Sequence, residues 1–243
     1  MRFTVEIRQK YDIWQLIFNH YGQATYIAFF TLFAGLTTIL FSLTLGFVYH
    51  TSFDMEYLGW CMIMAAGWMV GESKLRQVLV PNATVLATLC FVMIMLGPLP
   101  IIYYIDSMQS GRHQKLFWIA EAAAIVNFAV CTILHLSGAK DYIETLPIAH
   151  VILAVTLVLI LGTVFYDMYH GYITQNRFMV VGLLIAVVSV VVESISAYFV
   201  ISISGIFMGI GMIVLLFFSL VRTIRNLQKM ESRRQRQEMR KRR

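Results

Sequence analysis

Residues 147–168 read PIAHVILAVTLVLILGTVFYDM, a run of 22 residues with few polar side chains. A helix needs about 20 apolar residues to cross the hydrocarbon core of a bilayer, so this run predicts a membrane-spanning helix. The rest of the chain has the same character. Of its 243 residues 59% are hydrophobic and only 13% are charged, far from the balance of a water-soluble domain. The composition therefore indicates an integral membrane protein.

Apolar runs of similar length recur along the chain and are separated by short polar loops. We expect seven membrane helices, at about 24–49, 56–72, 83–105, 117–137, 147–168, 178–199 and 203–224. The chain lacks the alternating lipid-facing pattern of barrel strands, so the predicted fold is an all-α, seven-helix transmembrane bundle. Segment 56–72 is the shortest and contains three glycines. A six-helix alternative holds if that segment does not span the membrane.

The sequence divides into a membrane domain with two short ends. Residues 24–224 form the predicted seven-helix domain, and residues 225–243 form a basic cytoplasmic linker helix. Residues 1–23 lack the features of a cleavable signal peptide. Within them, residues 11–18 fit either a short interfacial helix, because aromatic side chains recur there at helical spacing, or a frayed polar end. The three cysteines lie far apart in apolar runs and propose neither disulfides nor a zinc site.

Basic residues set the expected orientation. Residues 221–243 hold ten of the nineteen lysines and arginines, which favours a cytoplasmic C-terminus. Seven crossings then place the N-terminus outside, with thirteen basic residues on the inner side and six on the outer side. Without the tail the outer side has more, so six helices with both ends inside remain an alternative.

The tail itself has three readings. The first is contact with anionic headgroups at the membrane surface, through Arg222, Arg225, Lys229, Arg233, Arg234 and Arg236. The second is a helical connector, because Ile224, Leu227 and Met230 continue the apolar line of the last segment. The third, nucleic-acid binding, is disfavoured because no recognisable nucleic-acid motif accompanies the charge.

Ionisable residues inside membrane segments are costly and usually face the bundle interior. In the expected orientation four of them, Glu72, His135, His150 and Glu193, converge on the outer half, and Ser189 and Ser196 share the helix face of Glu193. We expect these six residues to form a pocket for a small polar ligand, an ion or a proton. The alternative is structural: Glu72 pairs with Lys74 or Arg76, Glu193 is a protonated, hydrogen-bonded helix clasp, and the histidines are interfacial. Two histidines without firm geometry do not predict a metal.

Two further polar residues and several helix-breaking residues complete the pattern. Glu121 and Asp167 lie near the cytoplasmic face, where we expect them to pair with basic residues of the loops, Arg112, Lys115 or Arg177. Pro98 and Pro100, after Gly97, predict a kink in the third segment. Gly205 and Gly209 form a small-xxx-small pair that would let another helix approach, within the bundle or across a dimer.

Catalysis is not expected. No lysine lies within an apolar segment, which excludes a retinal Schiff base, and the chain has no phosphate-binding glycine loop, nucleophile elbow or zinc-protease motif. We therefore expect neither catalytic residues, nor a cofactor, nor a metal.

Four stretches carry a resemblance to a known family: GWMVGESKLRQVLVPN (67–82), MLGPLPIIYY (95–104), DYIETLPIAH (141–150) and VVVESISAYF (190–199). They resemble bacterial seven-transmembrane receptors with diverse intracellular signalling modules, especially those fused to GGDEF diguanylate cyclase domains. The resemblance covers residues 24–230. Its matching positions are Trp68, Glu72, Ser73, Pro98, Pro100, His150 and Glu193.

The resemblance implies a sensory domain in the bacterial inner membrane, forming a homodimer and passing a signal to a cytoplasmic output domain that makes cyclic di-GMP. No GGDEF sequence occurs in the chain, so we expect the sensor portion of a cyclase or a standalone relative, not an enzyme. The leading alternative is a small transporter or channel that uses the intramembrane carboxylates. A purely structural membrane subunit is a third possibility.

Overall fold

The computed structural model describes residues 2–49, 54–73, 75–76, 82–172, 177–198 and 205–241, and these residues form no strand. The all-α class is confirmed. The helices are α1 (Arg2–Tyr49), α2 (Met55–Glu72), α4 (Ala83–Leu96), α5 (Pro98–Met108), α6 (Gln114–Leu136), α7 (Tyr142–Tyr169), α8 (Arg177–Tyr198) and α9 (Ile206–Lys241).

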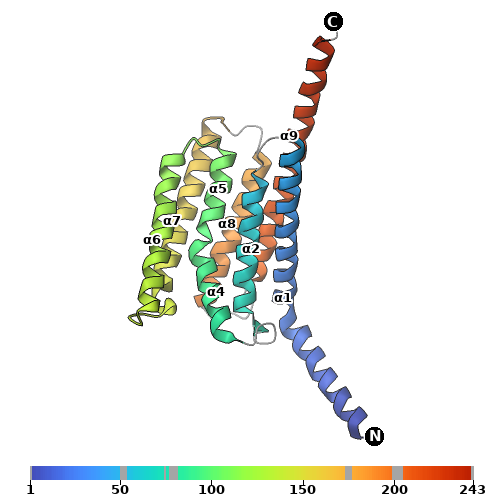
Figure 1. Cartoon of the computed structure of the whole chain (residues 1–243), viewed down its shortest axis with the longest axis vertical. Coiled ribbons are helices and arrows are strands. Elements are labelled where there is room, and N and C mark those ends of the chain that lie inside the picture. The colour runs from blue at the N-terminus through green and yellow to red at the C-terminus, as the bar shows by residue number, and fades with distance from the viewer. Residues whose placement is uncertain are drawn as a thin grey trace.

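Six stretches of these helices are long and apolar enough to cross a membrane: Gly22–Tyr49, Thr84–Met108, Gln114–Leu136, Tyr142–Tyr169, Phe178–Ser196 and Ile206–Ser232. They correspond to six of the seven predicted segments. Helix α7 begins five residues earlier than expected and includes Pro147 near its start. Helix α1 begins at Arg2, so the backbone of residues 2–23, which the prediction set apart as a short N-terminal segment, continues the first membrane helix and extends beyond the bundle (Figure 1).

Helix α2 is the predicted segment that does not reach the apolar content of a membrane span. It has 18 residues, with Glu56 in its first turn and Glu72 at its end. It nevertheless lies inside the bundle, where it packs against α1, α4, α5 and α9 (Figure 1). Neighbouring helices shield much of its surface, so α2 can be less apolar than a helix that faces lipid.

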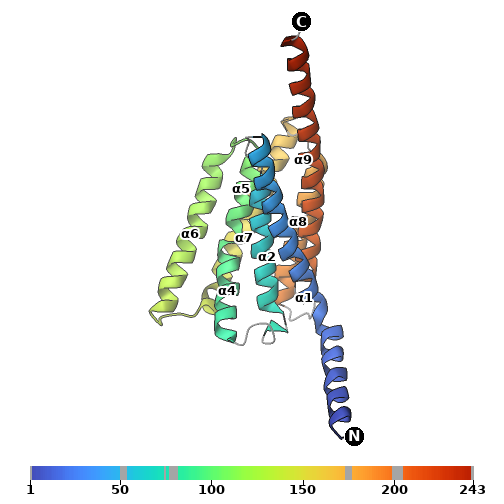
Figure 2. The same ribbon diagram turned by 45° about the vertical axis from the view of Figure 1, so that its right-hand side comes forward.

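Successive helices run in alternating directions, except that α5 continues in the direction of α4, and the two termini lie at opposite ends of the bundle (Figure 1). We call these the N-terminal end and the C-terminal end of the bundle. Figure 2 shows α6 at the side of the bundle away from α1, where it packs against α4, α5 and α7. Helix α9 packs mainly against α8 and continues past the C-terminal end as an isolated helix in both views.

The third segment is interrupted at the point where its prolines predict a kink, and we call this point the α4–α5 bend. Helix α4 ends at Leu96 and α5 begins at Pro98, with Gly97 between them in helical conformation. Proline lacks a backbone N–H and clashes with the preceding turn, so two prolines at this point interrupt the hydrogen-bond ladder. The two halves still form one apolar stretch, Thr84–Met108.

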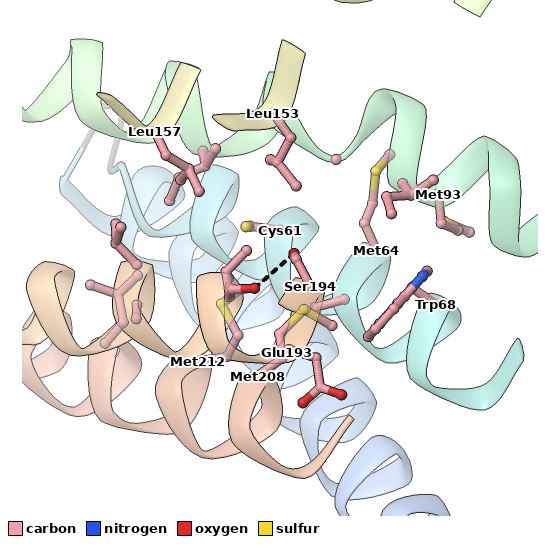
Figure 3. Close-up of a pocket in the computed structure, with 18 of the residues that line it drawn as sticks. Cys61, Met64, Trp68, Met93, Leu153, Leu157, Glu193, Ser194, Met208 and Met212 are labelled. Atoms are coloured by element: carbon pink, nitrogen blue, oxygen red, sulfur yellow. Dashed lines mark hydrogen bonds between the residues drawn. The ribbon is translucent and has the colours of Figure 1, made fainter. Parts of the chain in front are cut away.

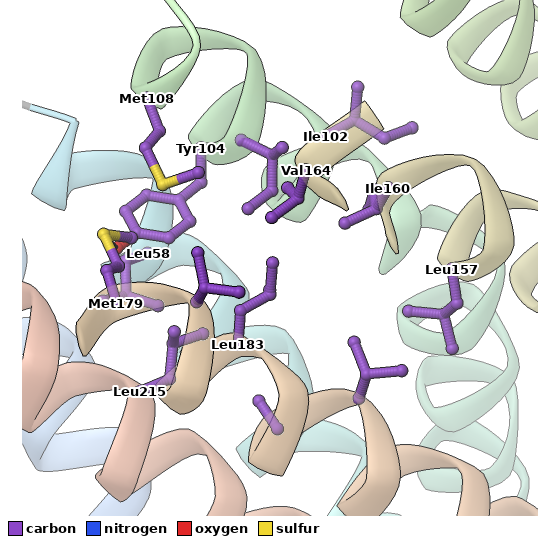
Figure 4. Close-up of a cluster of buried hydrophobic side chains, with 14 of the residues drawn as sticks. Leu58, Ile102, Tyr104, Met108, Leu157, Ile160, Val164, Met179, Leu183 and Leu215 are labelled. Carbon is purple, nitrogen blue, oxygen red and sulfur yellow. Dashed lines mark hydrogen bonds between the residues drawn. The ribbon is translucent and has the colours of Figure 1, made fainter. Parts of the chain in front are cut away.

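The core lies between α2, α5, α7, α8 and α9. Its fully buried side chains include Leu58, Ile102, Tyr104, Ile160 and Leu215. Figure 4 shows Tyr104 beside Leu58 of α2 and Met179 of α8. Lipid tails are as apolar as these side chains, so van der Waals packing, rather than the hydrophobic effect, favours this contact between helices.

The small-residue pair on α9 is used inside the chain. A Cβ atom on Gly209 would collide with Ile27 of α1, and one on Gly205 would lie 3.0 Å from Met69 of α2. Gly205 also has a φ of +92°, a backbone conformation that glycine adopts without steric cost. Of the two alternatives for this pair, the structure places it within the bundle rather than on an open dimer face.

Candidate functional site

A cavity lies between α2, the α4–α5 bend, α7, α8 and α9. Its volume open to water-sized molecules is about 110 Å³. Figure 3 shows that side chains from all these elements converge on it: Cys61, Met64 and Trp68 of α2, Met93 of α4, Leu153 and Leu157 of α7, Glu193 and Ser194 of α8, and Met208 and Met212 of α9. Gly97, at the bend, also lines it. The α4–α5 bend therefore forms part of the cavity wall.

Most of the lining is hydrocarbon or thioether. The polar members are few: Ser194 donates its hydroxyl to the Val190 carbonyl at 2.8 Å, and Cys61 is a free thiol. Glu193 is the one carboxyl among the described residues of the wall. A hydroxyl already bonded to its own helix offers little to a ligand, so the lining favours an apolar occupant.

Glu193 lies at the edge of the cavity, with its carboxylate turned toward the beginning of α9 (Figure 3). Its side chain is 1% exposed, and Oε1 accepts a hydrogen bond from the backbone N–H of Gly205. The N–H groups of Phe207 and Met208 also face the carboxylate. The first N–H groups of a helix have no partner within it and carry partial positive charge. Glu193 therefore acts as an N-terminal cap for α9, supplied by the preceding helix.

The carboxylate is not fully satisfied by this cap. Oε2 of Glu193 is buried and has no hydrogen-bond partner among the described residues. Of the two readings of Glu193, this geometry matches the hydrogen-bonded clasp and also leaves one acceptor atom beside the cavity.

Of the other residues predicted for the sensing pocket, Glu72 lies close enough to Glu193 to interact with it electrostatically, but the serines do not join it. Ser189 and Ser196 donate to the carbonyls of Ile185 and Val192 in their own helix, each at 2.8 Å. Neither serine lines the cavity. Glu72 is exposed at the end of α2, where its Oε1 accepts a weak hydrogen bond from the Cys90 thiol at 3.7 Å.

The surroundings of Glu72 test the alternative prediction that it forms an ion pair with a nearby cation. Among the described residues no ion pair joins Glu72 to Arg76. Arg76 instead donates to the Gly71 carbonyl at 3.3 Å. The other candidate cation, Lys74, lies outside the described residues. Next to Glu72, Ser73 turns inward and hydrogen bonds Thr25 of α1 at 2.6 Å.

The two histidines lie on α6 and α7, away from the cavity wall. His135 pairs with Asp141 at 3.4 Å, and its ring lies 4.2 Å from that of Tyr142. His150 Nδ1 lies 3.1 Å from the Leu146 carbonyl. The structure therefore brings the two carboxylates, Glu72 and Glu193, close enough to interact electrostatically, whereas neither histidine lines the cavity. The position of each residue along its helix correctly predicted the end of the bundle at which it lies, but not whether its side chain lines the cavity.

A second polar cluster, which the sequence did not predict, lies at the C-terminal end of the bundle. Asp54, just before α2, pairs with Arg222 of α9 at 2.6 Å, and their side chains are 24% and 14% exposed. Arg222 also approaches the sulfur of Met179 at 3.6 Å. The Tyr104 hydroxyl lies within hydrogen-bonding reach of Ser219 and Arg222. We call Asp54, Tyr104, Ser219 and Arg222 the α9 clasp.

Arg222 was predicted to contact headgroups, and the clasp corrects that prediction because its guanidinium faces the bundle and a carboxylate. Arg225 is exposed and lies 5.4 Å from the Phe178 ring. Lys229 is exposed on the part of α9 beyond the bundle. The side chains of Arg233, Arg234 and Arg236 lie outside the described ones. Because α9 leaves along the bundle axis, their backbone lies about 17–21 Å further along the helix than Arg222.

A third polar cluster confirms one expected pairing. Asp167 of α7 is fully buried and lies 3.0 Å from both Arg112 and His113, in the turn between α5 and α6. Arg112 also lies over the Tyr172 ring at 3.9 Å. This cluster fixes the α5–α6 turn against α7 at the C-terminal end of the bundle.

Within the part of the chain that the structure describes, no group of three or more His, Cys, Asp or Glu residues could hold a metal ion. Comparison of the sequence and structure with protein-family models, curated proteins and solved structures finds no match.

Proposed function

We propose that this chain is a membrane-embedded sensor that passes a signal from its bundle to a cytoplasmic output module through α9. The observation that carries the proposal is the course of this single helix. Helix α9 is capped by Glu193 at its start, lines the cavity through Met208, Met212 and Leu215, and enters the α9 clasp at Arg222. It then continues from Thr223 to Lys241, about 28 Å beyond the clasp.

Such a helix couples two sites if the bundle has two packings. An occupant of the cavity shifts their balance only if it binds one packing more tightly than the other. A shift or rotation of α9 at the cavity then reaches the extension, because a continuous helix transmits displacement along its axis. The α4–α5 bend at Gly97 gives the cavity wall a place to move.

Seven crossings agree best with this scheme. The termini lie at opposite ends of the bundle, as an odd number of crossings requires, and α2 is covered by its neighbours. The basic tail favours the cytoplasm for the C-terminus. On the resemblance described above, the output module is a GGDEF diguanylate cyclase domain, in cis or in trans. The protein acts as a homodimer in the bacterial inner membrane.

The test joins a diguanylate cyclase domain after Arg243 of the full chain and measures cyclic di-GMP in cells. Arg222→Gln, which opens the clasp, should change the output at unchanged protein level. Leu136→Ala is the matched control, because Leu136 is 79% exposed on α6 and should leave output unchanged. Equal output from both variants and the parent would refute the relay. Solute uptake into liposomes by the unfused chain would favour the transporter alternative instead.

A further inference from the structure

The cavity described above has a lining that specifies the chemistry of its occupant. Its wall carries four thioethers, a tryptophan and aliphatic side chains, and the Ser194 hydroxyl is already bonded within α8. Among the described residues, no lysine or arginine lines it. Apart from Glu193 Oε2 at the edge, the lining offers no free polar partner, so a charged or strongly hydrated molecule would lose most of its hydration here uncompensated, at a cost of several kcal/mol.

The size of the cavity limits the occupant further. An engineered apolar cavity of about 150 Å³ in another protein stays dry and binds benzene or xenon. The present cavity, of about 110 Å³, is somewhat smaller. It suits one aromatic ring or the end of a short alkyl chain. Methionine side chains are flexible and polarisable, so Met64, Met93, Met208 and Met212 can adjust to such a shape.

We propose that the cavity binds an uncharged hydrocarbon group of about the size of a benzene ring, taken up from the membrane. This replaces the polar ligand, ion or proton expected from the sequence. The same chemistry has two sources, a small apolar molecule dissolved in the bilayer or the end of a lipid acyl chain. The inference rests on the proposed function only in naming what the sensor detects; binding itself does not require an output.

Trp68 offers a direct readout, because it lines the cavity. The chain has four tryptophans. In the full chain with Trp14, Trp60 and Trp118 changed to Phe, all fluorescence comes from Trp68. A matched control keeps Trp118 alone, which is 69% exposed on α6. Heavy bromine atoms in contact with an indole quench its emission, so a bromine-bearing occupant reports its own position.

In the first arm, bromobenzene is titrated into protein in bilayers of unbrominated lipid. A free small molecule in the cavity gives loss of Trp68 emission that saturates, while Trp118 loses emission in proportion to bromobenzene in the membrane. In the second arm, the lipid is phosphatidylcholine brominated on its acyl chains and no bromobenzene is added. Stronger quenching of Trp68 than of exposed Trp118 then identifies an acyl chain as the occupant.

Filling the cavity should abolish the effect. Ala186→Leu adds three carbons at the wall formed by α8, and Ala65→Leu does so from α2, so two independent variants guard against misfolding of one. Either one that folds should remove saturable quenching of Trp68. Quenching of Trp68 that neither saturates with bromobenzene nor exceeds that of Trp118 in brominated lipid overturns the proposal, as does saturable quenching that survives filling.

A spin label separates this inference from the proposed function. With the three native cysteines replaced by alanine, a label at Met239→Cys on the extension of α9 reports movement of that helix; Met239 is 62% exposed. Saturable quenching together with an altered label spectrum supports both. Quenching with an unchanged spectrum keeps the binding site and refutes the relay. An output change in the fused chain without quenching keeps the relay and refutes this ligand.

Discussion

The ion pair between Asp54 and Arg222 makes the sharpest prediction about stability. Nη1 of Arg222 lies 2.6 Å from Oδ2 of Asp54, and both side chains are largely buried. At a separation of about 4 Å between charge centres, two unit charges near a protein surface attract by about 4 kcal/mol. Removing one partner of a fully buried pair costs about 3–5 kcal/mol. Both groups here keep some exposure, so we expect about 2–3 kcal/mol from each single substitution.

The two substitutions should not be equal. Asp54 lies at the N-terminus of α2, where the helix dipole stabilises a negative charge by up to about 1 kcal/mol even without Arg222. Arg222 has no such support, since its other neighbours are the neutral Tyr104 and Met179. Asp54→Asn should therefore destabilise the protein more than Arg222→Gln. The double variant should cost less than the sum of the single ones.

The assay is equilibrium unfolding in mixed micelles, with increasing sodium dodecyl sulfate and helicity followed by circular dichroism. Arg225→Gln is the matched control, because it removes the same charge one turn further along α9 at an exposed position. Its effect should stay within about 0.5 kcal/mol. Single substitutions that cost no more than the control, or costs that simply add in the double variant, would refute the coupling within the clasp.

Three further predictions use the same unfolding assay. Glu193→Gln, which replaces the carboxyl group that caps α9, should cost about 1–2 kcal/mol, and an unchanged midpoint would argue against the cap. Asp167→Asn should cost about 3 kcal/mol because its buried carboxylate has two cationic or hydrogen-bonding partners. Asp141→Asn should stay within about 0.5 kcal/mol, because the Asp141 side chain is 75% exposed in its pair with His135. Gly209→Ala should destabilise the protein by about 1–3 kcal/mol, because the new methyl group collides with α1. Gly162→Ala should stabilise the protein by about 0.5–1 kcal/mol, because Gly162 has open space around it. A change of the same sign for both variants would contradict the close contact at Gly209.

Much of the fold follows from composition and pattern. A membrane helix needs a run of apolar residues whatever its neighbours are, so each long run could be located from the sequence alone. The same applies to the bend at Gly97, because the effect of Pro98 on the helix ladder is local. The exception is segment 56–72. Its protein neighbours, rather than its own composition, place α2 in the bundle.

The candidate site was harder to predict. Helical spacing placed Ser189 and Ser196 beside Glu193, but both hydroxyls bond their own helix. His135 and His150 lie toward the predicted end of the bundle, but neither lines the cavity. The sequence does contain a signal for the clasp, since Asp54 and Arg222 both lie at the edge of an apolar run. No rule of spacing could pair them across 168 positions.

The sequence by itself determined the helical class, the approximate helix positions, the bend and the polar character of each helix end. These depend on interactions between neighbouring residues or on the balance between water and lipid, which a single segment experiences alone. The tertiary structure alone decided that Glu193 caps α9, that Arg222 meets Asp54, and that a hydrocarbon-lined cavity lies between five parts of the chain. Such features depend on the rotation of each helix about its axis, which is fixed by packing against helices that are remote in sequence.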